Sequence, residues 1–360
     1  MKKESNEFHV HPLVLKTLRE SAGMSPDDIA EKLKISKEKV IAIEDGEASF
    51  TMLQIKKLAD IYHRPLAVFL MDSPPQLPFT LTDYRINREK KLTPQVYLAQ
   101  RRAYYLSSKI AELSGKRSQI PLFAETQKAG EQAREFRKNM TLIKSQKAED
   151  TLNSYKKTLE EKLLISIIEY PFNADDVRAF CISSDISIIV LNEHDKPEIK
   201  LFSLFHEICH LLRRTSGICS IDIAKDKLEI ERYCNSFSAE FLVPEHALKQ
   251  DIGDLRVFNR KVISEFSESY AVSKQVIMLR LLSLGYITRG QYNDFKLNFD
   301  AEKLEKPEYG RRNWDKVFFN RVGYLAQQEV GRAYRKGEIS FSEVIGVFDI
   351  KSKYAEKLVT

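Results

Sequence analysis

The hydrophobic and polar positions of the first seventy residues follow short helical periods that turn signals interrupt. Leu13, Leu15 and Leu18 recur at near-helical spacing until Gly23 breaks the pattern. Similar short periods follow until a cluster of prolines sets in. We therefore predict a unit of five small helices over residues 10–73.

Two of these helices form a helix-turn-helix pattern. Ser25 and Pro26 supply a cap and a first-turn proline for the second helix, and Ser36 can cap the third. Two short helices joined by a tight turn are the arrangement that places a recognition helix in the major groove of DNA. Ser36, Lys37 and Lys39, at the start of the third helix, are therefore candidate DNA contacts. The alternative is a five-helix module used for protein contacts or dimerisation.

Residues 74–165 read as a basic helical linker region. Long helices are expected over residues 94–113 and 131–164, each with apolar residues on one face and Lys and Arg on the other. Residues 85–165 carry 18 Lys and Arg against 9 Asp and Glu, whereas residues 10–72 carry 9 against 10. Such a segment can meet nucleic acid or an acidic partner, and it can equally be a solvated surface.

The period changes to that of a strand between Ala179 and Asn192, where a β-branched run is bounded by a polar turn. A helix to Arg213, a polar loop through Ser220 and a helix over residues 227–242 are expected next. The fold class predicted from these patterns is mainly α with a small β-sheet (α+β). Most of the remaining chain has helical periods, so residues 291–360 are expected to form a helical C-terminal region.

Composition narrows the class of protein. The chain has 360 residues, enough for two or three domains, and 43% of them are hydrophobic, as in globular proteins. No run is long and apolar enough to span a bilayer, so no membrane partner is expected. The four cysteines show no CxxC spacing, which favours reduced thiols and predicts a cytoplasmic location.

The sequence HEICH carries the clearest chemistry. Its two histidines, His206 and His210, are four residues apart, so on a helix they share one face and can hold one cation. Glu207 lies next to the first histidine, where a general base for an attacking water is needed. The flanking residues are strongly apolar, which predicts a buried helix. A buried pair of histidines requires partners, and a metal ion supplies them.

A catalytic zinc site needs a third protein ligand and an open fourth position. The following helix, LEIERYCNSFSAEFLVP, offers the carboxylates of Glu229, Glu231 and Glu240. Spacing alone leaves the choice among these three open.

Two segments, FSLFHEICHLL and ERYCNSFSAEFLVP, together resemble the ImmA/IrrE metallopeptidases, and IAEKLKISKEKVIAIEDG resembles the helix-turn-helix of the Xre family. The resemblance implies a zincin-like domain over residues 166–290 that binds Zn²⁺. It also implies that Glu231 is the third metal ligand. Asn235 and Glu240 are then candidates for orienting the ligands or bracing the site. Cys209 and Cys234 depart from the small residues usual at their positions, and a fourth ligand from Cys209 is an alternative.

The function expected from the resemblance is a zinc metalloendopeptidase that cleaves a transcriptional repressor, itself an Xre-like protein, in a stress or mobile-element circuit. Double-stranded DNA is a second expected partner, and homodimerisation is left open. Residues 185–191 are expected to be an edge strand that pairs with extended substrate. The alternative is a DNA-binding regulator, or a toxin-antitoxin-like component, in which the zinc site is structural or sensory.

Overall fold

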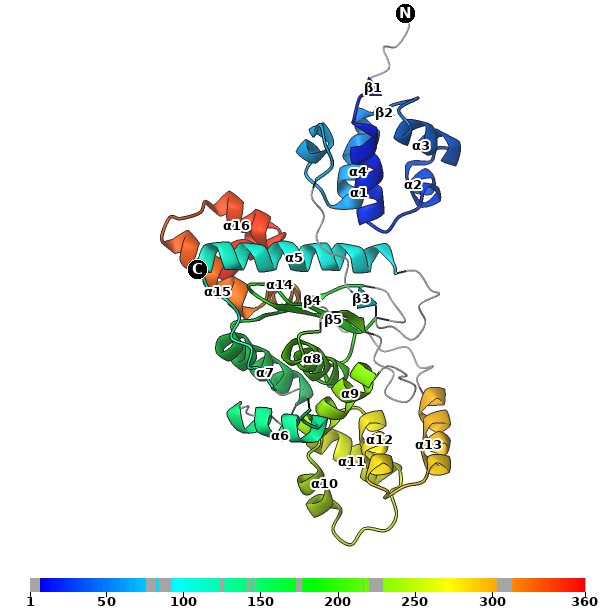
Figure 1. Cartoon of the computed structure of the whole chain (residues 1–360), viewed down its shortest axis with the longest axis vertical. Coiled ribbons are helices and arrows are strands. Elements are labelled where there is room, and N and C mark those ends of the chain that lie inside the picture. Colours follow the sequence, from blue (N-terminus) through cyan, green and yellow to red (C-terminus); the bar gives the residue numbers. More distant parts are fainter. Residues whose placement is uncertain are drawn as a thin grey trace, which may run out of the picture. The chain divides into compact units, whose positions relative to one another are not determined.

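The computed structural model in Figure 1 contains two compact units, described separately below. The first comprises residues 1–80, 90–102 and 172–174, and the second comprises residues 81–89, 103–171 and 175–360. The structure describes residues 7–75, 82–83, 92–123, 126–140, 144–145, 147–172, 177–215, 217–219, 229–302 and 313–359.

Within its described residues, the first unit contains four complete α-helices, the first part of a fifth (residues 94–102 of α5, Pro94–Ser114), one 3-10 helix and a two-stranded antiparallel ribbon. The complete elements are β1 (Glu7–Phe8), α1 (Pro12–Ser21), α2 (Pro26–Leu33), α3 (Lys37–Glu44), β2 (Phe50–Thr51), α4 (Met52–Tyr62) and η1 (Leu66–Leu70). The five predicted helices are therefore present, although the last is a 3-10 helix. The ribbon was not predicted, because two-residue strands leave no period to detect.

Capping explains where the paired helices α2 and α3 begin. The hydroxyl of Ser25 accepts the backbone N–H of Asp28, whose carboxylate accepts the N–H of Ser25, and Pro26 occupies the first turn. Ser36 caps α3 more simply, through its hydroxyl, which accepts the backbone N–H of Lys39. Between them Lys34 adopts the left-handed conformation that ends α2.

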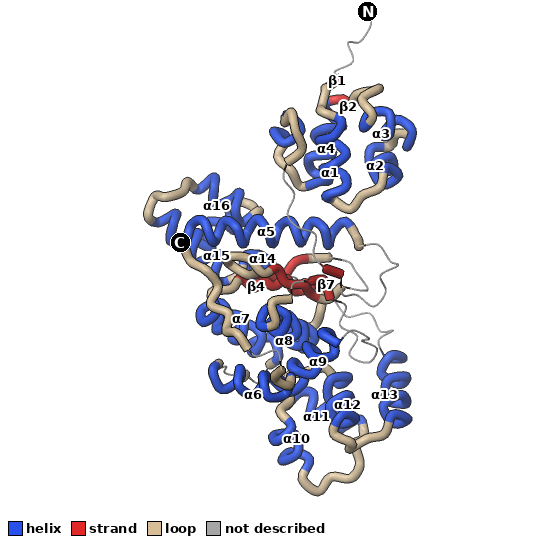
Figure 2. The backbone as a smooth tube through the Cα atoms, viewed as in Figure 1, coloured by secondary structure: helices blue, strands red, loops and turns tan. Residues whose placement is uncertain are grey.

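The second unit is built on a five-stranded mixed sheet in the order β3-β7-β5-β6-β4. Its strands are β3 (Thr82–Asp83), β4 (Ser166–Tyr170), β5 (Ala179–Ile182), β6 (Ile188–Asn192) and β7 (Gly217–Cys219). β6 runs parallel to β4 and antiparallel to β5, while β7 is antiparallel to β5 and parallel to β3. Figure 2 shows these strands lying between layers of helices.

Helices cover both faces of the sheet. On the sheet lie α5 (Pro94–Ser114), of which residues 103–114 belong to this unit, α7 (Ala148–Leu163) and α8 (Pro197–Leu212). Helix α9 (Glu229–Leu242) packs on α8, and α6 (Ala129–Asn139) packs on α9. The α5 segment lies on the face opposite α7 and α8 (Figure 1), and the hydroxyl of Ser107 donates to the carbonyl of Ile186. The α8 side forms the largest core, with Phe205, Phe237 and Phe241 fully buried.

The remaining helices follow α9 in sequence. They are α10 (Glu245–Ile252), α11 (Arg260–Tyr270), α12 (Lys274–Ser283), α13 (Arg289–Glu302), α14 (Trp314–Val322), α15 (Tyr324–Arg335), α16 (Phe341–Phe348) and α17 (Ser352–Val359). The mainly α fold with a small sheet is thus confirmed. No helix within the described residues is both long and apolar enough to cross a membrane.

The C-terminal helices are fixed against the β4 edge of the sheet by buried polar contacts. Glu160 of α7 accepts the backbone N–H groups of Ile167 on β4 and of Tyr324 and Leu325 at the start of α15. Gly323, between α14 and α15, lies so close that an added Cβ would be 2.9 Å from the carbonyl oxygen of Ile167. This edge of the sheet is therefore closed by helices.

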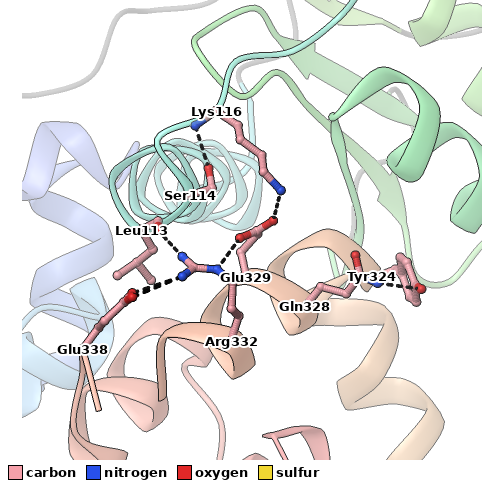
Figure 3. Close-up of polar contacts among 8 residues, drawn as sticks. All are labelled: Leu113, Ser114, Lys116, Tyr324, Gln328, Glu329, Arg332 and Glu338. Carbon is pink, nitrogen blue, oxygen red and sulfur yellow. Dashed lines mark hydrogen bonds and ion pairs between the residues drawn. The ribbon is translucent and has the colours of Figure 1, made fainter. Parts of the chain in front are cut away.

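A second set of contacts holds α15 to the end of α5 (Figure 3). Glu329 accepts from Lys116 at 2.7 Å and from Arg332 at 3.0 Å, and Arg332 also donates to the carbonyl of Leu113. Glu329 is buried, so both cations compensate a desolvated carboxylate.

Three predictions about this unit are wrong. The helix expected over residues 131–164 is two helices, α6 and α7, and Thr151 of α7 exchanges hydrogen bonds with the backbone of Ser145 in the turn before it. The loop expected through Ser220 contains β7, and Ser220 itself lies outside the described residues. The strand expected at an edge is β6, which is central, since its five residues are all buried, all five pair with β4 and four of them also pair with β5.

Candidate metal centre

The helix α8 brings both histidines of HEICH into the core. It begins at Pro197, a residue suited to the first turn, and is buried continuously from Lys200 to Leu212. His206 and His210 are four residues apart and fully buried. A helix this apolar is stable only between the sheet and α9, so its histidines face α9 rather than solvent.

Helix α9 supplies the third group. The carboxylate oxygens of Glu231 lie 3.2 Å from Nε2 of His206 and 3.1 Å from Nε2 of His210, and the two Nε2 atoms are 3.1 Å apart. A tetrahedral zinc ion with ligands at about 2.0 Å separates neighbouring ligand atoms by about 3.3 Å. The three groups therefore already have the spacing that one zinc ion requires.

Each imidazole is fixed on the side away from Glu231. Nδ1 of His206 is 2.9 Å from Oδ1 of Asn235, and Nδ1 of His210 is 2.9 Å from Oγ1 of Thr215. An oxygen partner at Nδ1 leaves Nε2 as the nitrogen that carries a lone pair toward a metal. Asn235 was a sequence candidate for this orienting contact, whereas Thr215 was missed.

The carboxylate of Glu207 is the most exceptional polar group of the site. It is fully buried, and neither oxygen has an N–H or O–H partner among the described residues. Burial raises the pKa of the Glu207 carboxyl, against the opposing effect of His210, His206 and the Cys181 thiol.

Glu231 has the opposite electrostatic setting. Burial opposes its ionisation, but the hydrogen bonds from His206 and His210 outweigh burial and lower the pKa of Glu231 to about 2. The pKa of His206 is raised, since the contacts with Glu231 exceed the cost of burial. The cluster thus holds a charged carboxylate, the form in which it binds metal.

Glu240, the other candidate from the sequence, lies in a separate cluster. Its carboxylate pairs with Arg134 of α6 at 3.1 Å and with Arg280 of α12, and Arg280 also donates to the carbonyl of Val243. These contacts join α6, α9 and α12 behind the site. We infer a bracing role for Glu240.

Three cysteines near the site, Cys181, Cys209 and Cys234, are buried. Among the described residues, the group of His, Cys, Asp or Glu side chains able to hold a metal consists of His206, His210 and Glu231. The alternative of a fourth ligand from Cys209 therefore has no support in the geometry.

The candidate DNA contacts lie in the first unit, on exposed positions of α3 and its cap. The hydroxyl of Ser36 accepts the N–H of Lys39 at 3.2 Å, so Ser36 has a structural role as the N-cap of α3. Lys37 forms a surface ion pair with Asp27 of α2 at 2.8 Å. Lys39 is exposed at the first turn of α3.

A buried cluster of two histidines and one glutamate, with a second glutamate beside it, is the kind of site that a metallopeptidase-like domain has. Residues 160–282 match the family model of the IrrE N-terminal-like domain, Peptidase_M78, and residues 13–68 match the model of a helix-turn-helix domain. The resemblance noted from the sequence is thus confirmed in its order of domains: a helix-turn-helix domain precedes an IrrE-type domain.

The other comparisons give less. A search of curated proteins finds no match. Among solved structures, a Mycobacterium tuberculosis transcriptional regulator is similar over 50% of this chain and 50% of its own, at 11% identity and a TM-score of 0.33.

Proposed function

We propose that the chain is a zinc-dependent endopeptidase whose metal is held by His206, His210 and Glu231. The spacing of the three ligand atoms and the oxygen partners of both Nδ1 atoms support this ligand set. A zinc ion there would act as a Lewis acid, polarising a peptide carbonyl and making water acidic enough to attack it at neutral pH. Three protein ligands leave the fourth position open for that chemistry.

The buried carboxylate of Glu207 is the observation that carries the proposal of catalysis. A structural zinc site has no use for a desolvated carboxylate without an N–H or O–H partner, and such a group is costly to bury. As a general base, Glu207 takes a proton from the attacking water and passes it to the leaving amine.

The proposed substrate is a transcriptional repressor of the Xre type. The helix-turn-helix domain supports a role in transcription, and the IrrE-type domain supports a protein substrate. A cytoplasmic location belongs to the same proposal, since it is where a protein that meets DNA and a repressor would act. A small Xre-like repressor encoded beside this gene is the first substrate to test.

The test combines zinc content with cleavage by the purified full chain. We expect about one zinc per chain, and cleavage of the neighbouring repressor at a defined peptide bond. Glu207→Gln should keep the zinc and lower turnover by at least about 100-fold. Glu198→Gln, on the first turn of the same helix, is the matched control and should leave both unchanged. Full turnover in Glu207→Gln would refute the base assignment, and a chain without affinity for zinc would refute the metal site.

A further inference from the structure

The strand next to the metal centre has an unusual neighbour. β7 pairs on one side with β5, and on its other side with β3, through Thr82 opposite Gly217 and Asp83 opposite Ile218. β3 comes from more than 130 residues earlier in the chain and is parallel to β7. The outer edge of β7 is therefore filled by a remote, two-residue segment of the same polypeptide.

The residue Thr215, just before β7, contacts a proposed metal ligand. Thr215, two residues before Gly217, hydrogen-bonds to Nδ1 of His210, and its backbone N–H donates to the carbonyl of His210 at 2.8 Å. The thiol of Cys181 on β5 donates to the carbonyl of Thr215 at 3.8 Å. The backbone that leaves the metal helix thus enters β7 almost at once.

The two edges of the sheet are closed in different ways. The β4 edge is covered by α14, Gly323 and α15, which Glu160 fastens through three backbone N–H groups. Among the described residues, the β7 edge is closed by β3 alone. The β3–β7 pair has two paired positions, whereas the β4–β6 pair has five. A strand edge exposes backbone groups that pair readily with another extended chain. The short cover on β7 is therefore the one that another strand can replace.

The segments of chain on both sides of β3 belong to the first unit. Residues 1–80 and 90–102 belong to the first unit, which contains the helix-turn-helix, while residues 81–89 belong to the second. β3 is thus joined covalently, on both sides, to the first unit. A rearrangement of that unit reaches β3 through the chain itself.

We propose that β3 is an internal blocking strand, which occupies the edge of β7 where an extended segment of protein substrate binds, and whose displacement opens the proposed peptidase site. This inference rests on the proposed function, and it names the substrate class as an extended polypeptide that adds to β7 by backbone pairing. The helix-turn-helix unit controls access because it holds both ends of the segment.

Single proline substitutions test the pairing. Successive N–H groups of a strand point to opposite sides, so only one of Thr82 and Asp83 donates toward β7. We expect one of Thr82→Pro and Asp83→Pro to raise amide hydrogen exchange over residues 217–219 at least tenfold, and the other to change it little. Thr82→Val, which keeps the N–H, is the matched control. If neither proline raises exchange, or both do equally, β3 is not a paired strand and the proposal is overturned.

Binding in trans tests the opened edge without requiring catalysis. The probe is a fluorescein-labelled peptide with the sequence of residues 78–87, PFTLTDYRIN, and its control is PFTLPPYRIN. The active proline variant should bind the first peptide at least tenfold more tightly than the wild type does, and the second peptide should bind neither. Equal binding by variant and wild type overturns the proposal.

Cleavage of β-casein, an unfolded substrate, separates this inference from the proposed function. With zinc bound, the active proline variant should cut casein severalfold faster than the wild type, and adding Glu207→Gln should abolish that cutting. If casein is cut equally fast by both, β3 does not block the site. If exchange and peptide binding change as expected but zinc-loaded variant and wild type both leave casein and the repressor intact, the blocked edge stands and the peptidase function falls.

Discussion

Thr215 and His210 hold each other in place: Oγ1 of Thr215 is 2.9 Å from Nδ1 of His210, and the threonine N–H donates to the histidine carbonyl at 2.8 Å. We predict that Thr215→Val lowers zinc affinity about 10- to 100-fold, because the imidazole loses the partner that orients Nε2. Thr215→Ser keeps the hydroxyl and should bind zinc like the wild type. Competition with a zinc chelator measures both affinities, and unchanged affinity in Thr215→Val would contradict the orienting role.

The assignment of Glu231 as the third ligand can be tested on its own helix. Glu231→Gln removes the negative charge between the two histidines. Loss of an orienting contact lowers zinc affinity about 10- to 100-fold, and we expect loss of this ligand to lower it further. Glu229→Gln, an exposed position at the start of the same helix, is the matched control. Isothermal titration with zinc measures both variants. Similar affinities would show that the carboxylate of residue 231 is not a ligand.

Burial raises the pKa of Glu160 to about 7, more than its hydrogen bonds and Lys156 lower it. At this residue the folded state therefore binds more protons than the unfolded state between about pH 4.5 and 7, so its contribution to stability falls as the pH rises through that window. We predict that the free energy of unfolding of the wild type falls by about 3 kcal/mol across this window because of Glu160. The variant Glu160→Gln should not show this fall. Urea unfolding from pH 5 to pH 8 measures it, with exposed Glu161→Gln as control. Parallel pH curves for the wild type and Glu160→Gln would contradict the prediction.

Gly323 should be intolerant of a side chain. Its φ of 82° and ψ of 161° belong to a region that only glycine adopts readily, and an added Cβ would press on Ile167. We predict that Gly323→Ala costs about 1 to 3 kcal/mol more than Gly337→Ala, whose φ is also positive but whose surroundings are open. Urea unfolding compares the two. Equal losses would mean that the close contact with β4 is unimportant.

DNA binding by the first unit can be read from its salt dependence. We predict that Lys37→Ala and Lys39→Ala each weaken binding and each reduce the slope of log affinity against log salt by about 1, because each removes one phosphate contact. Lys57→Ala, an exposed position on α4, is the control. Gel shifts on a DNA duplex selected for binding by the wild type, at several salt concentrations, measure the slopes. Slopes unchanged from the wild type would exclude α3 as the element that meets DNA.

The sequence predicted the parts of the site that depend on local spacing. The four-residue interval of the histidines and the caps of α2 and α3 follow from helix geometry alone. Thr215 could not be found this way, because it reaches His210 only after Arg214 adopts a positive φ of 55° and turns the chain back. The central position of β6 was also hidden, since its partners β4 and β5 become neighbours only through long-range pairing.

The first unit is not a continuous piece of sequence. Gly23 lies against the ring of Tyr97, and the guanidinium of Arg101 donates to the carbonyls of Tyr62 and His63. A gene fragment cut at the prolines after Asp72 would therefore encode a helix-turn-helix that lacks its packing partners Tyr97 and Arg101. Grafting this domain onto another protein, or exchanging it between relatives, requires the segment through residue 102 to travel with it.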